Sequence, residues 1–173
     1  MRSKYVGCQN FYCFYFSTSL AAHLRSLGDY DTQSQLLEFL LHVIPAARRR
    51  DFVEEYLHQG LSDLFCSIIG QQFESAARRF LNALNPVDPV TQTVFSIPCI
   101  GVRICGHELN CQPAALNSND EPFWVDFNLV PERITTYCVL SLRSDSVCDS
   151  EEGEQTWETI SIHPDVIEEV NVS

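Results

Sequence analysis

The stretch SDLFCSIIGQQFESAARRFLNAL, residues 62–84, carries the clearest structural signal in the chain. Its apolar side chains recur at three- and four-residue spacing, which places them on one face of a helix. Asn85 and Pro86 follow directly, and a proline cannot continue a helix. The sequence therefore predicts a helix that is capped by Ser62, bends or breaks at Gly70 and ends near residue 84. We expect its apolar face to lie in the core of a helical bundle.

Three further helices are predicted ahead of this stretch. Residues 17–27 form a helix with apolar residues on one face, and Gly28 follows as its stop because glycine favours the left-handed conformation after a helix. The second helix starts with Thr32 and Gln35, whose spacing is that of a capping box. The third carries apolar residues between positions 52 and 57 and ends near Gly60. We interpret the apolar faces of these helices as the core of a bundle. The alternative is that they line a groove for a partner helix.

The second half of the chain changes from a helical period to a strand period. Residues 90–105 are rich in strand-forming types and are interrupted by a proline and a glycine. Residues 123–129 alternate between apolar and polar types and lead through a turn into residues 134–142, which predicts a hairpin. Residues 156–162 are predicted as an extra strand, and the aromatic residues 11–16 as a short N-terminal strand.

The sequence thus predicts an α+β fold, with an N-terminal helical bundle of about four helices, a small antiparallel sheet and an acidic tail. The expected divisions are a mainly helical part at residues 1–86, a β part at residues 87–143 and an acidic, partly disordered tail at residues 144–173. A length of 173 residues with 45% apolar content suffices for a real core. No apolar run reaches the roughly 18 residues that a membrane span needs, so we expect a soluble protein.

Negative charge is concentrated at the C-terminal end. The formal net charge is −12, of which residues 144–173 contribute −9 because they hold no Lys or Arg. Since cationic contacts supply most of the affinity for nucleic acids, direct nucleic-acid binding is not expected. The one basic run, at residues 48–50, is predicted to pair along a helix with Asp51, Glu54 and Glu55.

Two serines of this tail have the surroundings that an acid-directed kinase requires. Ser146 has an aspartate three residues on, and Ser150 is followed by two glutamates. They are predicted modification sites, where a phosphate would add about −1.5 to −2 charges. The alternative is that the tail only keeps a phenylalanine-rich body soluble.

The eight cysteines are interpreted as free thiols. There is no convincing export signal, so the compartment is expected to be reducing and disulfides are not expected. Cys105, His107 and Cys111 are the only candidates for a metal site, but their spacing matches no common zinc signature. We therefore expect neither a metal nor another cofactor.

No catalytic signature stands out. A nucleophile elbow, a glycine-rich phosphate loop and a His-Glu-x-x-His zinc helix are all absent. A pair such as Cys138 with His107 stays open, because catalytic partners are close in space rather than in sequence. The sequence is interpreted as that of a non-enzymatic protein.

Lysine is almost absent. Lys4 is the only one among 11 basic residues, although Arg and Lys serve equally well as solvated surface charges. Two interpretations remain open. The protein works beside ubiquitin transfer and keeps few acceptor amines, or its reading frame is viral and constrained by drift or by an overlapping frame.

The run LLEFLLHVIP, residues 36–45, followed by residues 51–57, resembles the F-box-like segment of the polerovirus silencing suppressors. It departs from that family's pattern at residues 32–33, where a Leu-Pro pair is expected. The resemblance implies recruitment of a cullin-type ubiquitin ligase and assigns partner binding to the apolar residues of this run, namely Leu36, Leu37, Leu40, Leu41 and Pro45.

A second resemblance lies in the hairpin. Trp124-Val125-Asp126, with similar residues downstream at 133–134 and 138–140, resembles the second signature box of the anti-proliferative BTG/Tob family. Phe127 replaces the proline of that box. The resemblance implies a regulatory adaptor that binds a deadenylase or a transcription factor, with Trp124 as a partner-binding residue.

Together these features predict a viral accessory protein that acts as an interaction adaptor against a host defence. Its partners would be host proteins, with a ubiquitin-ligase component among them. The expected location is the cytoplasm or nucleus of a host cell. The BTG/Tob-like adaptor is the alternative.

Overall fold

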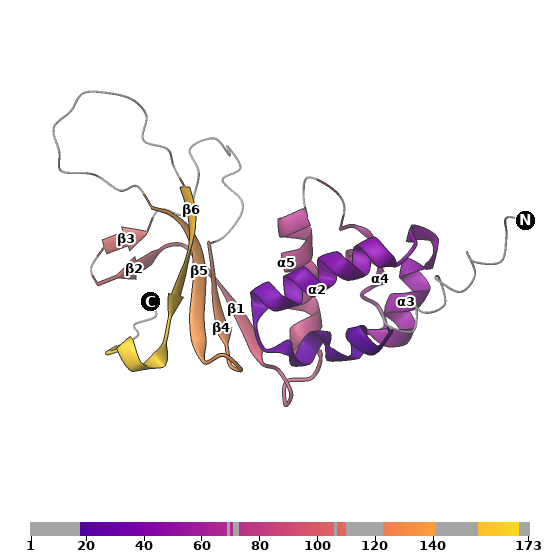
Figure 1. The fold of residues 1–173 in the computed structure, drawn as a ribbon, viewed down its shortest axis with the longest axis horizontal. Coiled ribbons are helices and arrows are strands. Elements are labelled where there is room, and N and C mark those ends of the chain that lie inside the picture. Colours follow the sequence, from indigo (N-terminus) through magenta and orange to yellow (C-terminus); the bar gives the residue numbers. More distant parts are fainter. Residues whose placement is uncertain are drawn as a thin grey trace, which may run out of the picture. The chain divides into compact units, whose positions relative to one another are not determined.

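The computed structural model describes residues 18–68, 70, 73–105, 107–109, 123–140 and 156–169. Helices occupy the N-terminal part of the chain and strands the C-terminal part (Figure 1). The chain divides into two compact units. The helical unit comprises Met1–Phe95 and Leu129–Pro131, and the sheet unit comprises Ser96–Asn128 and Glu132–Ser173. The predicted α+β class is confirmed.

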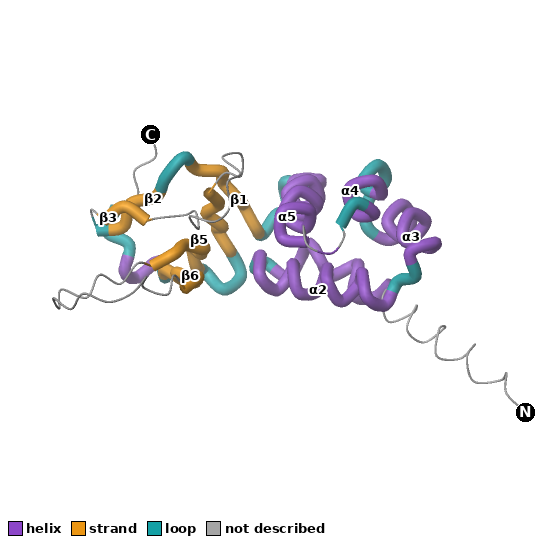
Figure 2. Tube along the Cα trace, turned by 90° about the horizontal axis from the view of Figure 1, so that it is seen from above, coloured by secondary structure: helices purple, strands orange, loops and turns teal. Residues whose placement is uncertain are grey.

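In the helical unit, residues 18–23 are helical and continue into a short 3-10 helix, η1 (Leu24–Leu27), which Gly28 ends with φ = 68° as predicted. α5 packs against α2 and α4, and α4 packs against α3 (Figure 2). The elements after Gly28 are α2 (Tyr30–Val43), η2 (Ala46–Arg48), α3 (Arg49–Tyr56), α4 (Ser62–Cys66), α5 (Phe73–Leu84) and η4 (Asn85–Val87).

The core of this unit is built from the apolar faces of these helices. Phe65 of α4 meets Phe80 of α5 edge to face, with ring centroids 5.3 Å apart. Each large apolar side chain that is buried in this way contributes about 1.5–3 kcal/mol. The fully buried large apolar side chains include Leu24, Leu37, Leu40, Phe52, Val53, Phe65, Phe80, Leu81 and Leu84.

α2 starts earlier than the sequence pattern predicted. Asp29 is its N-cap, because the backbone N–H and the hydroxyl of Thr32 both donate to Asp29 Oδ1, at 3.0 and 2.8 Å. Thr32 therefore lies inside the helix and Gln35 is exposed, so the predicted capping box at these two residues is wrong. A carboxylate at the true cap satisfies donors that the helix leaves free.

The stretch at residues 62–84 forms two helices rather than one. α4 ends at Cys66, Gly70 has φ = +44°, and α5 begins at Phe73, so the predicted break is confirmed. The predicted cap is wrong, because Leu61 is the N-cap of α4 and has no side-chain cap bond. Ser62 is instead the first helical residue and is buried.

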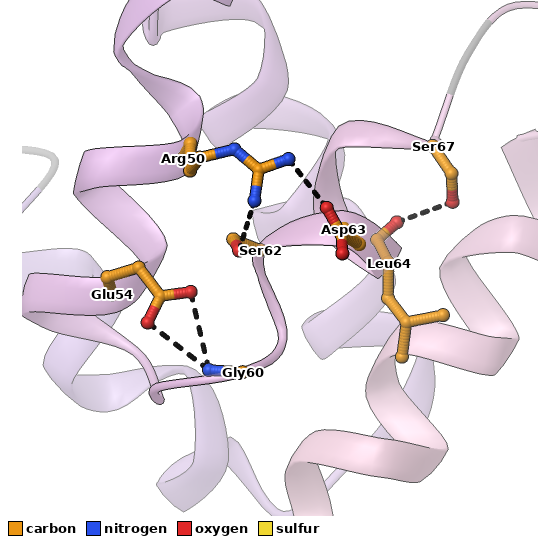
Figure 3. Close-up of polar contacts among 7 residues, drawn as sticks. All are labelled: Arg50, Glu54, Gly60, Ser62, Asp63, Leu64 and Ser67. Atoms are coloured by element: carbon orange, nitrogen blue, oxygen red, sulfur yellow. Dashed lines mark hydrogen bonds and ion pairs between the residues drawn. The ribbon is translucent and has the colours of Figure 1, made fainter.

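Within the basic run at residues 48–50, Arg49 and Arg50 contact residues outside α3, which the predicted pairing along one helix did not include. Arg49 donates to the carbonyls of Leu41 and Ile44, at 2.7 and 3.3 Å, and so satisfies acceptors at the end of α2. Arg50 forms an ion pair with Asp63 at 2.6 Å and donates to Ser62 Oγ at 3.1 Å (Figure 3).

The sheet unit contains most of a four-stranded antiparallel sheet, which confirms the predicted hairpin and the extra strand at residues 156–162. Its strands are β1 (Val94–Cys99), β4 (Phe123–Asn128), β5 (Arg133–Leu140) and β6 (Thr156–Ile162), in the order β1-β4-β5-β6. β1 starts at the end of the helical unit. β2 (Val102–Ile104) and β3 (His107–Leu109) form a separate antiparallel pair, and η5 (Pro164–Val166) follows β6.

Residues 90–105 were predicted to be interrupted by a proline and a glycine. The interruption at Gly101 is confirmed, since Ile100 and Gly101 separate β1 from β2, but Pro98 lies inside β1 and does not interrupt it. The predicted strand at residues 11–16 and the acidic segment at residues 144–155 lie outside the described residues. Within the described part of the chain, no helix is both long and apolar enough to cross a bilayer.

Candidate interaction surface

The register of the strands assigns side chains to the two faces of the sheet. Asp126 of β4 lies opposite Thr135 of β5, whereas Phe127 lies opposite Ile134. Because successive side chains of a strand point to opposite faces, Asp126 and Thr135 share one face and Phe127 and Ile134 share the other.

Buried polar side chains join the first three strands on the face of Asp126. Ser96 Oγ of β1 donates to Asp126 Oδ1 at 2.6 Å, and Asn128 Nδ2 donates to Thr135 Oγ1 at 2.8 Å. Asp126, Asn128 and Thr135 are almost completely buried. Hydrogen bonds of this kind depend on one strand register, so they fix the pairing of β1, β4 and β5.

Sequence reasoning identified the apolar face of the hairpin but missed this polar face. Alternation placed Phe123, Val125 and Phe127 on one apolar face. Phe123 is buried, whereas Val125 and Phe127 are only half-buried. The buried Asp126 and Asn128 are the types that usually lie in solvent. Ser96 and Asp126 are 30 residues apart in the chain, so no local pattern could have paired them.

The opposite face stays partly exposed and apolar. Ile134 pairs with Ile162, and Thr136 pairs with Ile160. The two isoleucines of β6 and Ile134 are half-buried. On this face, half-buried apolar side chains reach the last strand beside the buried Thr136 and Cys138, and Glu158 is its exposed charge on β6.

β6 forms one end of the sheet. It pairs with β5 over seven consecutive residue pairs, from Ile134–Ile162 to Leu140–Thr156, without a bulge. Its other side has no strand partner among the described residues. We call residues 156–162 with this open side the β6 edge. Such an edge presents unpaired backbone N–H and C=O groups, which can bind a further strand.

The two ends of the sheet differ in their protection. β1, at the opposite end, contains Pro98, and proline removes a backbone donor. β6 contains no proline or lysine, which are two common protections of an exposed edge. Glu158, Thr159 and Ser161 are exposed along it. The β6 edge is therefore the candidate interaction surface.

The partner-binding residues that were predicted on α2 divide into two groups. Leu37, Leu40 and Leu41 are buried in the core of the helical unit, which favours a role in folding. Leu36 packs partly against this core, and Pro45 is exposed. Trp124 of β4 is half-buried, and its carbonyl accepts a hydrogen bond from the Thr136 hydroxyl at 2.9 Å.

The remaining predicted sites are only partly visible. Cys105 is exposed, and β3 begins at His107, but Cys111, Ser146 and Ser150 lie outside the described residues. Within those residues, no group of three or more His, Cys, Asp or Glu side chains is placed to hold a metal ion.

Cys138 is a buried thiol rather than an activated one. Burial raises the pKa of Cys138, and the nearby charge of Glu158 raises it further. A thiolate is the nucleophilic form, so a raised pKa lowers the reactivity of this residue.

No protein-family model matches the chain. The chain is 32% identical over 135 residues to the synaptonemal complex protein 2-like protein of Xenopus laevis, covering 78% of this chain and 13% of that protein. It is 33% identical over 119 residues to the mouse 2-like protein, covering 68% of this chain and 14% of that protein. Mouse synaptonemal complex protein 2 is 24% identical over 156 residues, covering 90% of this chain and 10% of that protein.

A solved structure described as a synaptonemal complex protein has the same fold, with a TM-score of 0.55 and 19% identity. The match covers 88% of this chain and 46% of the solved one. This chain thus corresponds to a small part of the curated relatives that it matches. None of the relatives' names denotes an enzyme.

These similarities overturn the predicted identity. The viral accessory protein with a host ubiquitin-ligase partner is wrong, and so are the polerovirus and BTG/Tob resemblances. The leucine spacing at residues 36–45 is that of any helix with a buried face, and α2 uses it for the core. The sequence matches, together with the shared fold, indicate that the chain is homologous to a region of synaptonemal complex protein 2 and the 2-like proteins.

Proposed function

We propose that this chain is a structural, non-enzymatic part of the synaptonemal complex and acts in meiotic nuclei by binding other proteins. The observation that carries the proposal is the 32–33% identity to two synaptonemal complex protein 2-like proteins over 119–135 residues. The names of these relatives refer to the synaptonemal complex, and we propose that this chain belongs to the same assembly.

The geometry of both units supports a binding role. Each unit contains hydrogen bonds between buried side chains, which form only when its helices or strands are packed in one way. Each unit therefore has one folded form and presents a defined surface. The sheet unit ends in the β6 edge, which is suited to strand addition.

We also keep the predicted divisions at residues 86 and 143 as a proposal for the organisation of the chain. In the proposed tail, residues 156–162 pair with β5 and so belong with the sheet. Leu36, Pro45 and Trp124 keep some exposed surface and stay candidates for partner contact. Phosphorylation of Ser146 and Ser150 also stays a prediction.

The proposal can be tested by purifying the tagged full-length protein from meiotic and from mitotic cells of its source organism. We expect mass spectrometry to recover other synaptonemal complex proteins from the meiotic cells only. A matched control carries Leu40→Asp, which places a charge in the core and should unfold the helical unit. If meiotic cells yield no synaptonemal complex protein, the proposed function is wrong. Partners that the Leu40→Asp control also recovers bind outside the helical unit.

A further inference from the structure

The β6 edge has the length and regularity of a strand-addition site. Its seven residues pair with β5 without a bulge, so its open side keeps the regular spacing of a strand. A partner strand would gain main-chain hydrogen bonds along this side. Side chains of β6 would then select the sequence of that strand, because directly opposed residues have Cβ atoms about 4.5–5.5 Å apart.

The side chains of β6 set an alternating pattern. Glu158, Ile160 and Ile162 lie on one face, since their β5 partners Cys138, Thr136 and Ile134 share that face. Thr159 and Ser161 lie on the other. A matching strand carries a basic residue opposite Glu158 and apolar residues opposite the two half-buried isoleucines, with small polar residues between them.

The carboxylates on β6 and in the segment that follows it outnumber the one basic side chain nearby, Arg133 of β5. Glu158, Asp165, Glu168 and Glu169 are exposed, and residues 144–173 contain no Lys or Arg. A second copy of this chain would bring the same acidic side chains to the edge, and facing like charges destabilise a strand pair. A segment with positive charge is attracted instead.

We propose that the β6 edge binds an extended, basic segment of a partner protein as an additional antiparallel strand. The antiparallel direction follows the rest of the sheet and gives slightly more stable pairing. In this direction the segment reads apolar, polar, apolar, polar, basic. This inference adds the chemistry of a protein partner to the proposed function. It rests on that function only because both require the chain to bind other proteins.

The test uses a fluorescent heptapeptide with the sequence Val-Thr-Val-Thr-Arg-Thr-Arg and the full-length chain. Binding is followed by fluorescence anisotropy, and amide hydrogen exchange of residues 158–162 is measured with and without the peptide. A second peptide has both arginines replaced by glutamate. Two more carry N-methyl groups, one on the odd and one on the even residues, because alternate N–H groups of a strand point to opposite edges.

We expect the basic peptide to bind and to slow amide exchange in β6. The glutamate peptide should bind at least tenfold more weakly. One N-methylated peptide should bind like the parent and the other at least tenfold more weakly, since only one edge faces β6. Glu158→Gln should weaken binding by about fivefold, whereas Glu38→Gln, an exposed glutamate on α2, should leave it unchanged.

Equal binding of both N-methylated peptides would show charge attraction without strand pairing and would overturn the inference. No binding of the basic peptide would overturn it too, as would a dimer in sedimentation that shields the β6 amides in the free protein. None of these three outcomes depends on meiotic cells. A failure here with correct partners in meiotic extracts would therefore leave the proposed function standing.

Discussion

The side-chain amides of Gln33 and Asn85 bind each other inside the helical unit. Gln33 Nε2 donates to Asn85 Oδ1 at 2.9 Å, and Asn85 Nδ2 donates to Gln33 Oε1 at 3.0 Å. Gln33 Nε2 also donates to the carbonyl of Leu24 at 3.0 Å. With exposed fractions of 0% and 5%, the two amides have little access to water. They connect η1 and α2, which are neighbours in the sequence, with η4, because Gln33 and Asn85 are 52 residues apart.

Asn85→Ala should lower the free energy of unfolding by about 1–3 kcal/mol, because it leaves a buried amide of Gln33 partly unsatisfied. Gln33→Ala should cost a similar amount, and the double variant should cost clearly less than the sum. Urea denaturation measures all three. Gln35→Ala is the matched control on the exposed face of α2 and should change stability by less than about 0.5 kcal/mol. Additive costs would contradict the pairing.

Gly28 and Gly60 provide a second comparison. Both have positive φ, at 68° and 87°, which an alanine adopts at a cost of about 1–2 kcal/mol. A Cβ atom at Gly28 would also overlap the side chain of Val130, whereas nothing lies within 4 Å of one at Gly60. Gly28→Ala should therefore cost about 2–4 kcal/mol and Gly60→Ala about 1–2, as measured by thermal and urea unfolding. Equal costs would show that Val130 does not pack there.

The sequence pattern located the elements well and their ends less well. Apolar spacing found α2, and Gly28 marked the end of the helix before it, because both signals are local. The true cap Asp29 was missed because Thr32 offered an equally good capping pattern three residues later. The pairs Gln33–Asn85 and Ser96–Asp126 could not be predicted, since they depend on the tertiary fold.

Acid should weaken the contact between α3 and the loop before α4. The pKa of Glu54 lies below its ordinary value because the Ser62 side chain and Gly60 N–H stabilise its carboxylate. Gly60 N–H donates to the two carboxylate oxygens at 3.2 and 3.3 Å (Figure 3). A carboxyl group whose pKa is lowered in the folded state stabilises the fold at pH values above its pKa in the unfolded chain, which is near 4.3. This stabilisation is lost as the pH falls through the pKa of the folded state.

The stability difference between the wild type and Glu54→Gln should therefore be constant from about pH 7 to 5 and shrink below about pH 4. Thermal unfolding over this pH range measures it. Asp88, whose pKa is also lowered, chiefly by the Thr91 hydroxyl, is present in both proteins and cancels in the comparison. A difference that persists unchanged at pH 3 would exclude the role of the Glu54 carboxylate.

The described cysteines should differ sharply in reactivity. Cys105 is exposed, whereas Cys138 is buried and its pKa is raised by burial and then by Glu158. At pH 8, iodoacetamide should modify Cys105 within minutes and Cys138 only after denaturant is added. Peptide mapping by mass spectrometry distinguishes the two sites. Equal labelling rates in the native protein would contradict the burial of Cys138.

Function was harder to predict than fold. The scarcity of lysine favoured a viral or ubiquitin-linked protein, but the relatives belong to the synaptonemal complex, and nothing in the structure explains why Lys4 is the only lysine. The residues that suggested an F-box-like segment lie on a core helix, where leucines at this spacing are common. Packing constraints of this kind recur in unrelated folds, so they identify a helix and not a partner.

The location of the protein during meiosis tests the proposed function most directly. The full-length protein that contains this sequence should be tagged at its own gene and imaged in spread meiotic nuclei of the source organism. We expect continuous lines along paired chromosomes during meiotic prophase and no such signal on mitotic chromosomes. A diffuse or cytoplasmic signal while the chromosomes are paired would contradict a structural role in the synaptonemal complex.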